Sequence, residues 1–145
     1  MSIEYKINEP VTTDQFIELL VNSTLGERRP IDDRHCMEGM ISNSNLTVSA
    51  WSGSKLVGIA RSMTDFHYAC YLSDLAVSKN HQKSGIGKQL QILTQEQLGP
   101  KCKLILIAAP EINKTEINKT VTIGKKAAVH SLKFSRQDFI CAEGV

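Results

Sequence analysis

Alternating and clustered apolar positions divide the first half of the chain into short strands. Residues 3–7 alternate apolar and polar side chains, which predicts a strand. Residues 46–51 and 56–63 are strand-like and are joined by a turn at 52–55, which predicts an antiparallel hairpin. Residues 68–77 predict a fourth strand, which is the third long one.

Two helices are expected among these strands. Thr12 and Gln15 have the spacing of a capping box, which predicts that a helix follows Thr12. Pro30, followed by Ile31-Asp32-Asp33, predicts a second helix that runs to about Ile41. In this interpretation the proline is close to the first helical position and the acids lie in the first turn, at the positive end of the helix dipole.

A third helix and a buried strand follow in the middle of the chain. Ile86, Leu90 and Leu93 recur at spacings of four and three, as on one face of a helix, and Gly99-Pro100 is expected to end it. The continuous apolar run 104–109 predicts a strand that is covered on both faces. Together with the strand at 68–77, this helix and this strand form a β-α-β unit, whose two strands should be parallel. The pattern predicts an α/β fold with a mixed sheet.

The last third of the chain is less regular. Residues 111–120 repeat Glu-Ile-Asn-Lys-Thr in tandem, which we interpret as a lengthened surface loop or helix start. Residues 121–129 predict a helix that Gly124 weakens, and residues 131–141 predict a terminal strand or hairpin.

Composition narrows the function classes. The chain has 145 residues, of which 41% are hydrophobic and 22% are charged, so residues 1–145 are expected to form a single domain. A net charge of only +2 argues against a nucleic-acid partner. Because no apolar run is long enough to span a bilayer or resembles a signal peptide, we expect a cytoplasmic protein without a membrane partner. The four cysteines are scattered without a C-x-x-C pair, so no metal site is expected.

The segment Gln82–Lys88 directly follows the apolar strand and carries two glycines at the start of a helix. Such a turn presents free backbone N–H groups at a positive helix end, which suits a pyrophosphate. The Rossmann pattern fails because Leu90 stands at its third glycine, and the Walker A pattern fails because Gln89 stands at its hydroxyl position. A tight turn without any ligand is the alternative explanation for the glycines Gly85 and Gly87.

The spacing Gln82-x-x-Gly85-x-Gly87 fits a third pattern completely. It resembles the acetyl-CoA-binding motif of the GNAT superfamily of N-acetyltransferases. Residues 56–61, 71–77 and 104–109 look like the third, fourth and fifth strands of that family. The resemblance implies a mixed, mostly antiparallel central sheet with a parallel splayed strand pair and flanking helices. It also implies acetyl-CoA as the co-substrate and a primary amine, of a small molecule or a peptide, as the acceptor.

The resemblance also implies roles for individual residues. The pantetheine arm would pair with Leu75, Ala76 and Val77, and the Leu75 N–H would polarise the thioester carbonyl. Asp74 is the candidate base, and a carboxylate hydrogen-bonded to backbone at a strand end is the alternative. The pyrophosphate would lie on the turn formed by Gln82, Lys83, Ser84, Gly85, Ile86, Gly87 and Lys88.

The general acid and the acceptor site match the family less well. In the family a tyrosine protonates the CoA thiolate, but its expected position here falls near Val129. The neighbouring His130 is therefore the candidate acid. The alternative is that His130 is an ordinary surface histidine. We expect a charged cluster and one aromatic residue to recognise the acceptor. The alternatives are that the charged residues form a solvated helix start and that the tryptophan lies in the core. These residues are Arg28, Arg29, Asp32, Asp33 and Trp51.

Three functions therefore remain at this level. The first is an acetyl-CoA-dependent N-acetyltransferase that works by direct transfer. The second is a non-catalytic acyl-CoA-binding sensor or assembly module, which the altered C-terminal third favours. The third is a nucleotide binder of the P-loop kind. A homodimer is expected because small domains of this type pair through exposed sheet edges.

Overall fold

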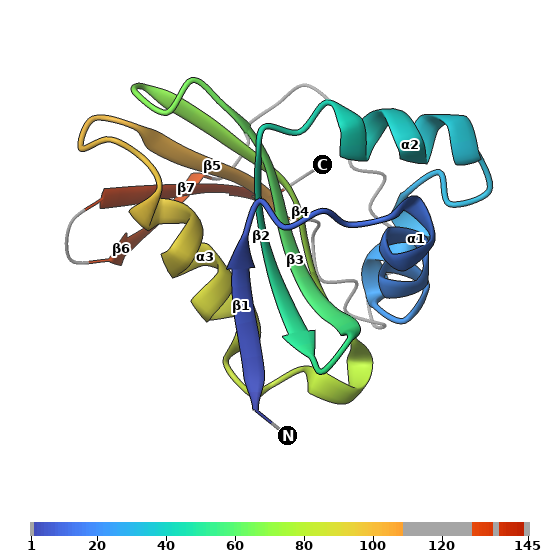
Figure 1. The fold of residues 1–145 in the computed structure, drawn as a ribbon. Coiled ribbons are helices and arrows are strands. Elements are labelled where there is room, and N and C mark those ends of the chain that lie inside the picture. Colours follow the sequence, from blue (N-terminus) through green and yellow to red (C-terminus); the bar gives the residue numbers. More distant parts are fainter. Residues whose placement is uncertain (1, 109–128, 135–136, 144–145) are drawn as a thin grey trace, which may run out of the picture.

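The computed structural model describes residues 2–108, 129–134 and 137–143. The described strands form one seven-stranded sheet in the order β1-β2-β3-β4-β5-β7-β6 (Figure 1). Neighbours from β1 to β4 are antiparallel, β5 is parallel to both β4 and β7, and β6 is antiparallel to β7. The strands are β1 Ile3–Ile7, β2 Leu46–Ser52, β3 Lys55–Thr64, β4 Ala69–Val77, β5 Lys103–Ala108, β6 Val129–Phe134 and β7 Gln137–Glu143. The helices are α1 Thr13–Val21, η1 Thr24–Arg28, α2 Arg34–Ser42, η2 Lys79–His81 and α3 Ile86–Glu96.

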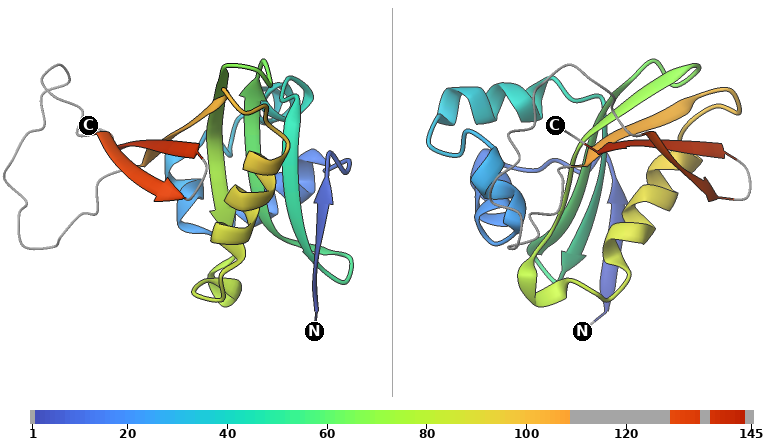
Figure 2. Two further views of the ribbon diagram at one scale, coloured as in Figure 1. Left: turned by 90° about the vertical axis from the view of Figure 1, so that its left-hand side faces the viewer. Right: turned by 180° about the vertical axis from the view of Figure 1, so that it is seen from behind.

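The helices cover both faces of the sheet. Figures 1 and 2 show α3 against one face and α1 and α2 against the other. On the α3 face, Ile86 and Leu90 pack with Val57, Leu72 and Leu104 in one hydrophobic core. Complete burial of a side chain such as Leu90 contributes about 1.5–3 kcal/mol to stability. This fold class, with a mixed sheet and flanking helices, is the one that the sequence predicted.

A second core lies on the face of α1 and α2. Phe16 and Leu20 of α1 and Met37 of α2 pack against Ile59 of β3 and Ala76 of β4. All five side chains are at most 1% exposed. The two cores hold the middle of β3 and β4 between helices, so these two strands are packed on both faces.

Helix boundaries follow capping chemistry. The capping box predicted at Thr12 and Gln15 is present, with Thr12 Oγ1 accepting from the Gln15 N–H at 3.2 Å and Gln15 Oε1 accepting from the Thr12 N–H at 2.9 Å. The predicted start of the second helix is wrong, because α2 begins at Arg34. Asp33 is its N-cap and accepts from the Cys36 N–H at 3.0 Å, so Pro30 precedes the helix as part of a turn.

The end of α3 and the burial of β5 also differ from the prediction. Helix α3 ends at Glu96, before Gly99-Pro100, and the Gly99 N–H instead donates to the Phe66 carbonyl at 2.8 Å. Strand β5 is not covered on both faces along its length, because Leu104 is fully buried while Ile107 is 51% exposed. The apolar run therefore marks a strand whose second half loses its neighbour β4, as described below.

The C-terminal prediction of a hairpin is confirmed by β6 and β7, which pair from Val129–Ala142 to Phe134–Gln137. Of the helix predicted at 121–129, residues 121–128 lie outside the described residues, and Val129 begins a strand. The tandem repeat at 111–120 also lies outside them.

Candidate functional site

Strand β4 contains a bulge at Ser73. Arg61 of β3 is opposite Asp74, whereas the next residue, Ser62, is opposite Leu72, so Ser73 has no partner on β3. One extra residue reverses the alternation of faces along the strand. Leu72 therefore packs in the core on the α3 face, while Asp74 and Ala76 turn toward the face of α1 and α2.

The bulge also reverses the directions of the backbone groups. Beyond it, the Ser78 N–H donates to the Val57 carbonyl at 2.9 Å. Antiparallel ladders alternate hydrogen-bonded and non-hydrogen-bonded pairs, so Ala76 and Asp74 bond to β3. The N–H and C=O groups of Leu75 and Val77 consequently point to the opposite edge of the strand, toward β5.

Strand β5 does not accept these groups. The parallel pairing of β4 with β5 runs only from Ala69–Lys103 to Leu72–Leu106, and β5 then continues alongside β7. Among the described strands none pairs with this edge of residues 73–77. The parallel splayed pair predicted from the resemblance is therefore present, and the strand edge next to the gap carries the backbone N–H of Leu75.

The turn after β4 opens α3 without a side-chain cap. Lys83 has φ +62° and Gly85 has φ +84°, both in the left-handed region. Gly85 is the N-cap, and the first helical hydrogen bond runs from the Gln89 N–H to the Gly85 carbonyl at 3.0 Å. The amides of Ile86 and Gly87 thus precede the hydrogen-bonded part of the helix, at its positive end.

The turn is tied to the splayed edge by Gln82. Its Nε2 donates to the Val77 carbonyl at 3.0 Å, and the Ser84 hydroxyl donates to the His81 carbonyl. Lys83 and Ser84 are exposed. The structure therefore brings the predicted cofactor residues of β4 and of the turn together at one end of the sheet.

The structure does not fit the expectation that Asp74 is a catalytic base. Its side chain is 0% exposed and lies between two guanidinium groups. Oδ1 accepts from Arg29 Nε at 2.6 Å and Oδ2 accepts from Arg61 Nε at 2.5 Å. Because both oxygens are engaged and shielded from solvent, an incoming amine has no access to this carboxylate.

The charged residues expected to bind the acceptor separate into two groups. Arg29 is already bound within the protein. Besides Asp74, its Nη2 donates to the Ser73 carbonyl at 3.0 Å and its Nη1 donates to the Arg28 carbonyl at 2.9 Å. Asp33 caps α2. Arg28, at the end of η1, and Asp32, in the connection to α2, are exposed and remain candidates for acceptor contact.

Trp51 is a core residue, which corrects its predicted place in the acceptor cleft. It is 6% exposed, packs in the core on the side of α1 and α2, and donates from Nε1 to Ser49 Oγ at 2.8 Å. Burial of the large apolar surface of a tryptophan side chain stabilises the core in which it packs. His130 lies on β6, the outer strand of the sheet beyond β5 and β7.

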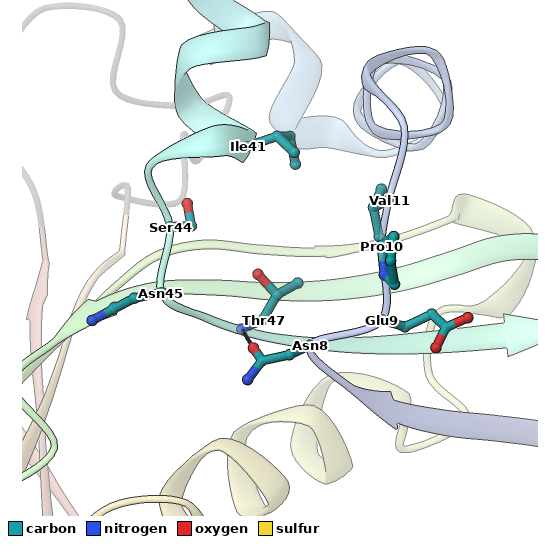
Figure 3. A pocket seen from close by; sticks show the side chains of 8 residues that line it. All are labelled: Asn8, Glu9, Pro10, Val11, Ile41, Ser44, Asn45 and Thr47. Atoms are coloured by element: carbon teal, nitrogen blue, oxygen red, sulfur yellow. Dashed lines mark hydrogen bonds between the residues drawn. The ribbon is translucent and has the colours of Figure 1, made fainter.

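A pocket of about 350 Å³ lies away from the splayed strands, between residues 8–11, which follow β1, and residues 41–47, which lead from α2 into β2 (Figure 3). At its floor Asn8 Oδ1 accepts from the Thr47 N–H at 2.9 Å, and Asn45 is held by the backbone of Thr64. Its amide groups thus already bind neighbouring backbone, and we assign no catalytic role to it.

Arg61 is the functional candidate that sequence reasoning missed. It is 5% exposed, and it binds Ser73 Oγ at 3.1 Å and Ser44 Oγ at 2.8 Å in addition to Asp74. A single charged residue within the strand segment 56–63 was the available signal, since a buried charge requires a partner.

Comparisons with known proteins agree with this geometry. Residues 22–123 match the acetyltransferase (GNAT) domain family. This match spans more than half of the chain, so the protein belongs to the GNAT acetyltransferase family. Membership of this family implies an acyl-CoA-dependent acetyltransferase. No match was found among curated proteins.

Solved structures show the same fold. A GNAT-family acetyltransferase from Streptococcus pneumoniae TIGR4 has 23% identity and a TM-score of 0.61, over 78% of this chain and 80% of that chain. The PaiA N-acetyltransferase from Thermoplasma acidophilum, in complex with coenzyme A, has 18% identity and a TM-score of 0.52, over 66% and 71%. An aminoglycoside 6'-N-acetyltransferase complexed with coenzyme A has 27% identity and a TM-score of 0.50, over 67% of this chain and 55% of that chain.

Within the described part of the chain, no helix is long and apolar enough to cross a membrane. In the same part of the chain no group of three or more His, Cys, Asp or Glu side chains could hold a metal ion.

Proposed function

We propose that this protein transfers the acetyl group of acetyl-CoA directly to a primary amine. The observation that carries the proposal is the continuity between the unpaired edge of β4 and the uncapped start of α3. Gln82 joins them through its hydrogen bond to the Val77 carbonyl. The structures of family members solved with coenzyme A support the choice of cofactor.

The cofactor would be held along its length by backbone groups. Its pyrophosphate would lie against the amides at the start of α3, where the helix dipole favours negative charge. Its pantetheine arm would extend along residues 75–77 and pair with the N–H and C=O groups of Leu75 and with the Val77 N–H like an added strand. Lys88, in the first turn of α3, is the predicted side-chain contact to phosphate.

The Leu75 N–H would act on the reacting thioester. In the tetrahedral intermediate the carbonyl oxygen becomes an oxyanion, and a fixed donor at this point is worth about 2.7–4 kcal/mol of barrier. The amine nitrogen forms a bond to the carbonyl carbon, and the carbon–sulfur bond then breaks to release the CoA thiolate. Because Leu75 contributes only its backbone, substitution of its side chain would not remove this donor.

Proton transfer then needs a group other than Asp74. The amine must lose one proton to become a nucleophile and another after its attack, and the thiolate gains one. With Asp74 engaged by two arginines, we propose that water in the gap takes the amine protons. The role of His130 as the acid stays a prediction, to be checked by the effect of His130→Ala on kcat.

The cofactor is tested by thermal unfolding with and without acetyl-CoA, with ATP–magnesium as the control. Ligand at 100 times its dissociation constant stabilises a protein by about 2.7 kcal/mol, which at this size raises Tm by several degrees. A rise with acetyl-CoA alone supports the proposal. No rise, or a rise only with ATP–magnesium, contradicts it.

Turnover separates an enzyme from a binding module. If the protein binds acetyl-CoA, release of free CoA thiol should accelerate with some member of a panel of polyamines, amino acids, aminoglycosides and peptides. The burial of Asp74 favours the second candidate, a non-catalytic acyl-CoA-binding module, because it removes the expected base. Acetyl-CoA binding without release by any amine would favour that candidate.

The predicted homodimer and cytoplasmic location stay predictions. Pairing through the C-terminal strands is the proposed dimer contact, since β6 is an edge of the described sheet. Sedimentation equilibrium that gives the mass of one chain would contradict the dimer.

A further inference from the structure

The bulge residue Ser73 is held from two sides by arginines of different elements. Its carbonyl accepts from Arg29 Nη2 at 3.0 Å, and its hydroxyl oxygen accepts from Arg61 Nη2 at 3.1 Å. Both arginines also bind Asp74, the residue that follows the bulge. The four residues form one connected network, which we name the bulge clamp.

The members of the clamp differ in burial. Asp74 is 0% exposed and the side chain of Arg61 is 6% exposed, whereas the side chain of Arg29 is 24% exposed. Arg61 is also held by the Met40 carbonyl and by Ser44. Arg29 instead comes from the connection between η1 and α2, so it is the member that links the proposed acceptor side to β4.

The bulge decides which way the Leu75 amide points. Before it, the Asp65 N–H donates to the Ala69 carbonyl at 3.2 Å, so an unbroken alternation would direct the Leu75 N–H toward β3. The extra residue Ser73 reverses that direction and turns the Leu75 N–H to the gap beside β5. The geometry of this one bulge therefore determines the position of the proposed oxyanion donor.

We propose that Arg29 is a positioning residue that fixes the Ser73 bulge and, through it, orients the Leu75 N–H for the thioester. This inference rests on the proposed acetyltransferase function. Arg29 acts through its contacts with the Ser73 carbonyl and Asp74, and it does not touch the reacting atoms. It makes the rate of transfer depend on the connection between η1 and α2.

Arg29→Gln is the variant that tests the clamp. It removes the charged fork but leaves Asp74 paired with Arg61, so no buried carboxylate is left without a cation and the fold is expected to survive. Arg29→Lys keeps the charge without the planar fork that bridges Ser73 and Asp74. Arg34→Gln is the matched control, because Arg34 lies nearby in sequence but forms exposed ion pairs with Asp14 and Glu38.

Two measurements are made on the wild type and the three variants. The first is the ¹H–¹⁵N spectrum without ligand, in which we expect the Leu75 amide to shift in Arg29→Gln and Arg29→Lys and to stay in place in Arg34→Gln. The second is acetyl-CoA turnover with the amine identified by the panel above. Because the clamp orients the donor for the transition state, kcat should fall about tenfold or more in Arg29→Gln, while the KM for acetyl-CoA changes less than about threefold.

The outcomes separate the inference from the function on which it rests. An unshifted Leu75 amide overturns the clamp, whatever the kinetics. A shifted amide with unchanged kcat, or with a loss confined to KM, overturns the positioning role. A wild type that neither binds nor turns over acetyl-CoA overturns the proposed function itself, and an amide shift would then mark the clamp as purely structural. If Arg29→Gln does not fold, the same criteria apply to Arg29→Lys.

Discussion

At the scale of single residues, neighbours decide what a carboxylate does. Asp74 lies inside β4, and Asp65 directly follows β3. Asp74 is fully buried between two guanidinium groups, whereas Asp65 is exposed and its Oδ1 accepts three backbone N–H groups, from His67, Tyr68 and Ala69. Asp74 neutralises the buried positive charge of Arg61, whereas Asp65 holds the backbone of the connection between β3 and β4.

Asp74→Ala should destabilise the protein strongly. It leaves Arg61 buried without its carboxylate, and loss of one partner from a buried ion pair costs about 3–5 kcal/mol. Urea unfolding measures this loss, with Asp14→Ala as the control, because Asp14 pairs with Arg34 at the surface and its loss should cost less than about 1 kcal/mol. A variant that loses activity with its unfolding free energy unchanged would restore Asp74 as a catalytic base.

Asp65 should make the fold sensitive to acid. Its three backbone hydrogen bonds lower the pKa of the carboxyl from 3.8 to about 2. A lowered folded-state pKa adds stability above the unfolded value, and this stability is lost as the pH falls toward 2. The urea midpoint should therefore fall less steeply between pH 4 and pH 2 in Asp65→Asn than in the wild type. Equal slopes in the two proteins would contradict the prediction.

At the scale of elements, the turn before α3 depends on backbone conformation. Gly85 has φ +84° and an added Cβ would meet no atom within 4 Å, so substitution there is a test of the backbone alone. Gly39 in α2 has equally open space but lies inside a helix without a positive φ. The two glycines therefore form a matched pair with opposite expectations.

Gly85→Ala should lower the free energy of unfolding by about 1–2 kcal/mol, because a left-handed conformation is unfavourable for alanine. Gly39→Ala should raise it by up to about 1 kcal/mol through helix propensity. Urea unfolding measures both, and the acetyl-CoA-dependent rise in Tm should shrink in Gly85→Ala alone. Equal effects of the two substitutions would show that the turn does not need its left-handed residue.

Most elements were predictable because their signals are local. The strands β1 to β4, the hairpin between β2 and β3, and the helix after Thr12 follow from alternation, turn residues and capping. The start of α2 was misplaced because Pro30 and Asp33 suit both a first turn and the segment before it. Only the observed hydrogen bond from the Cys36 N–H to Asp33 distinguishes the two.

At the scale of the whole molecule, the candidate site arises where two strands separate. The pairing of β4 with β5 ends at Leu72–Leu106, and the turn that opens α3 lies at the end of the released strand edge. The turn could be predicted from Gln82–Lys88, because its glycine spacing is local. The partners of Asp74 could not be predicted in this way, because Arg29 and Arg61 lie 45 and 13 residues away along the chain.

The sequence by itself determined the class of fold and the turn that opens α3, because strand periodicity and glycine conformation act within a few residues. Tertiary structure alone decided that Trp51 lies in the core, that Asp74 is enclosed by arginines and that Leu75 directs its amide to the gap. For Trp51 the physical reason is the packing of α1 and α2 over this face of the sheet. For Asp74 and Leu75 it is the bulge at Ser73, whose single extra residue reverses both faces and both edges of β4 and is seen only when β3 is paired beside it.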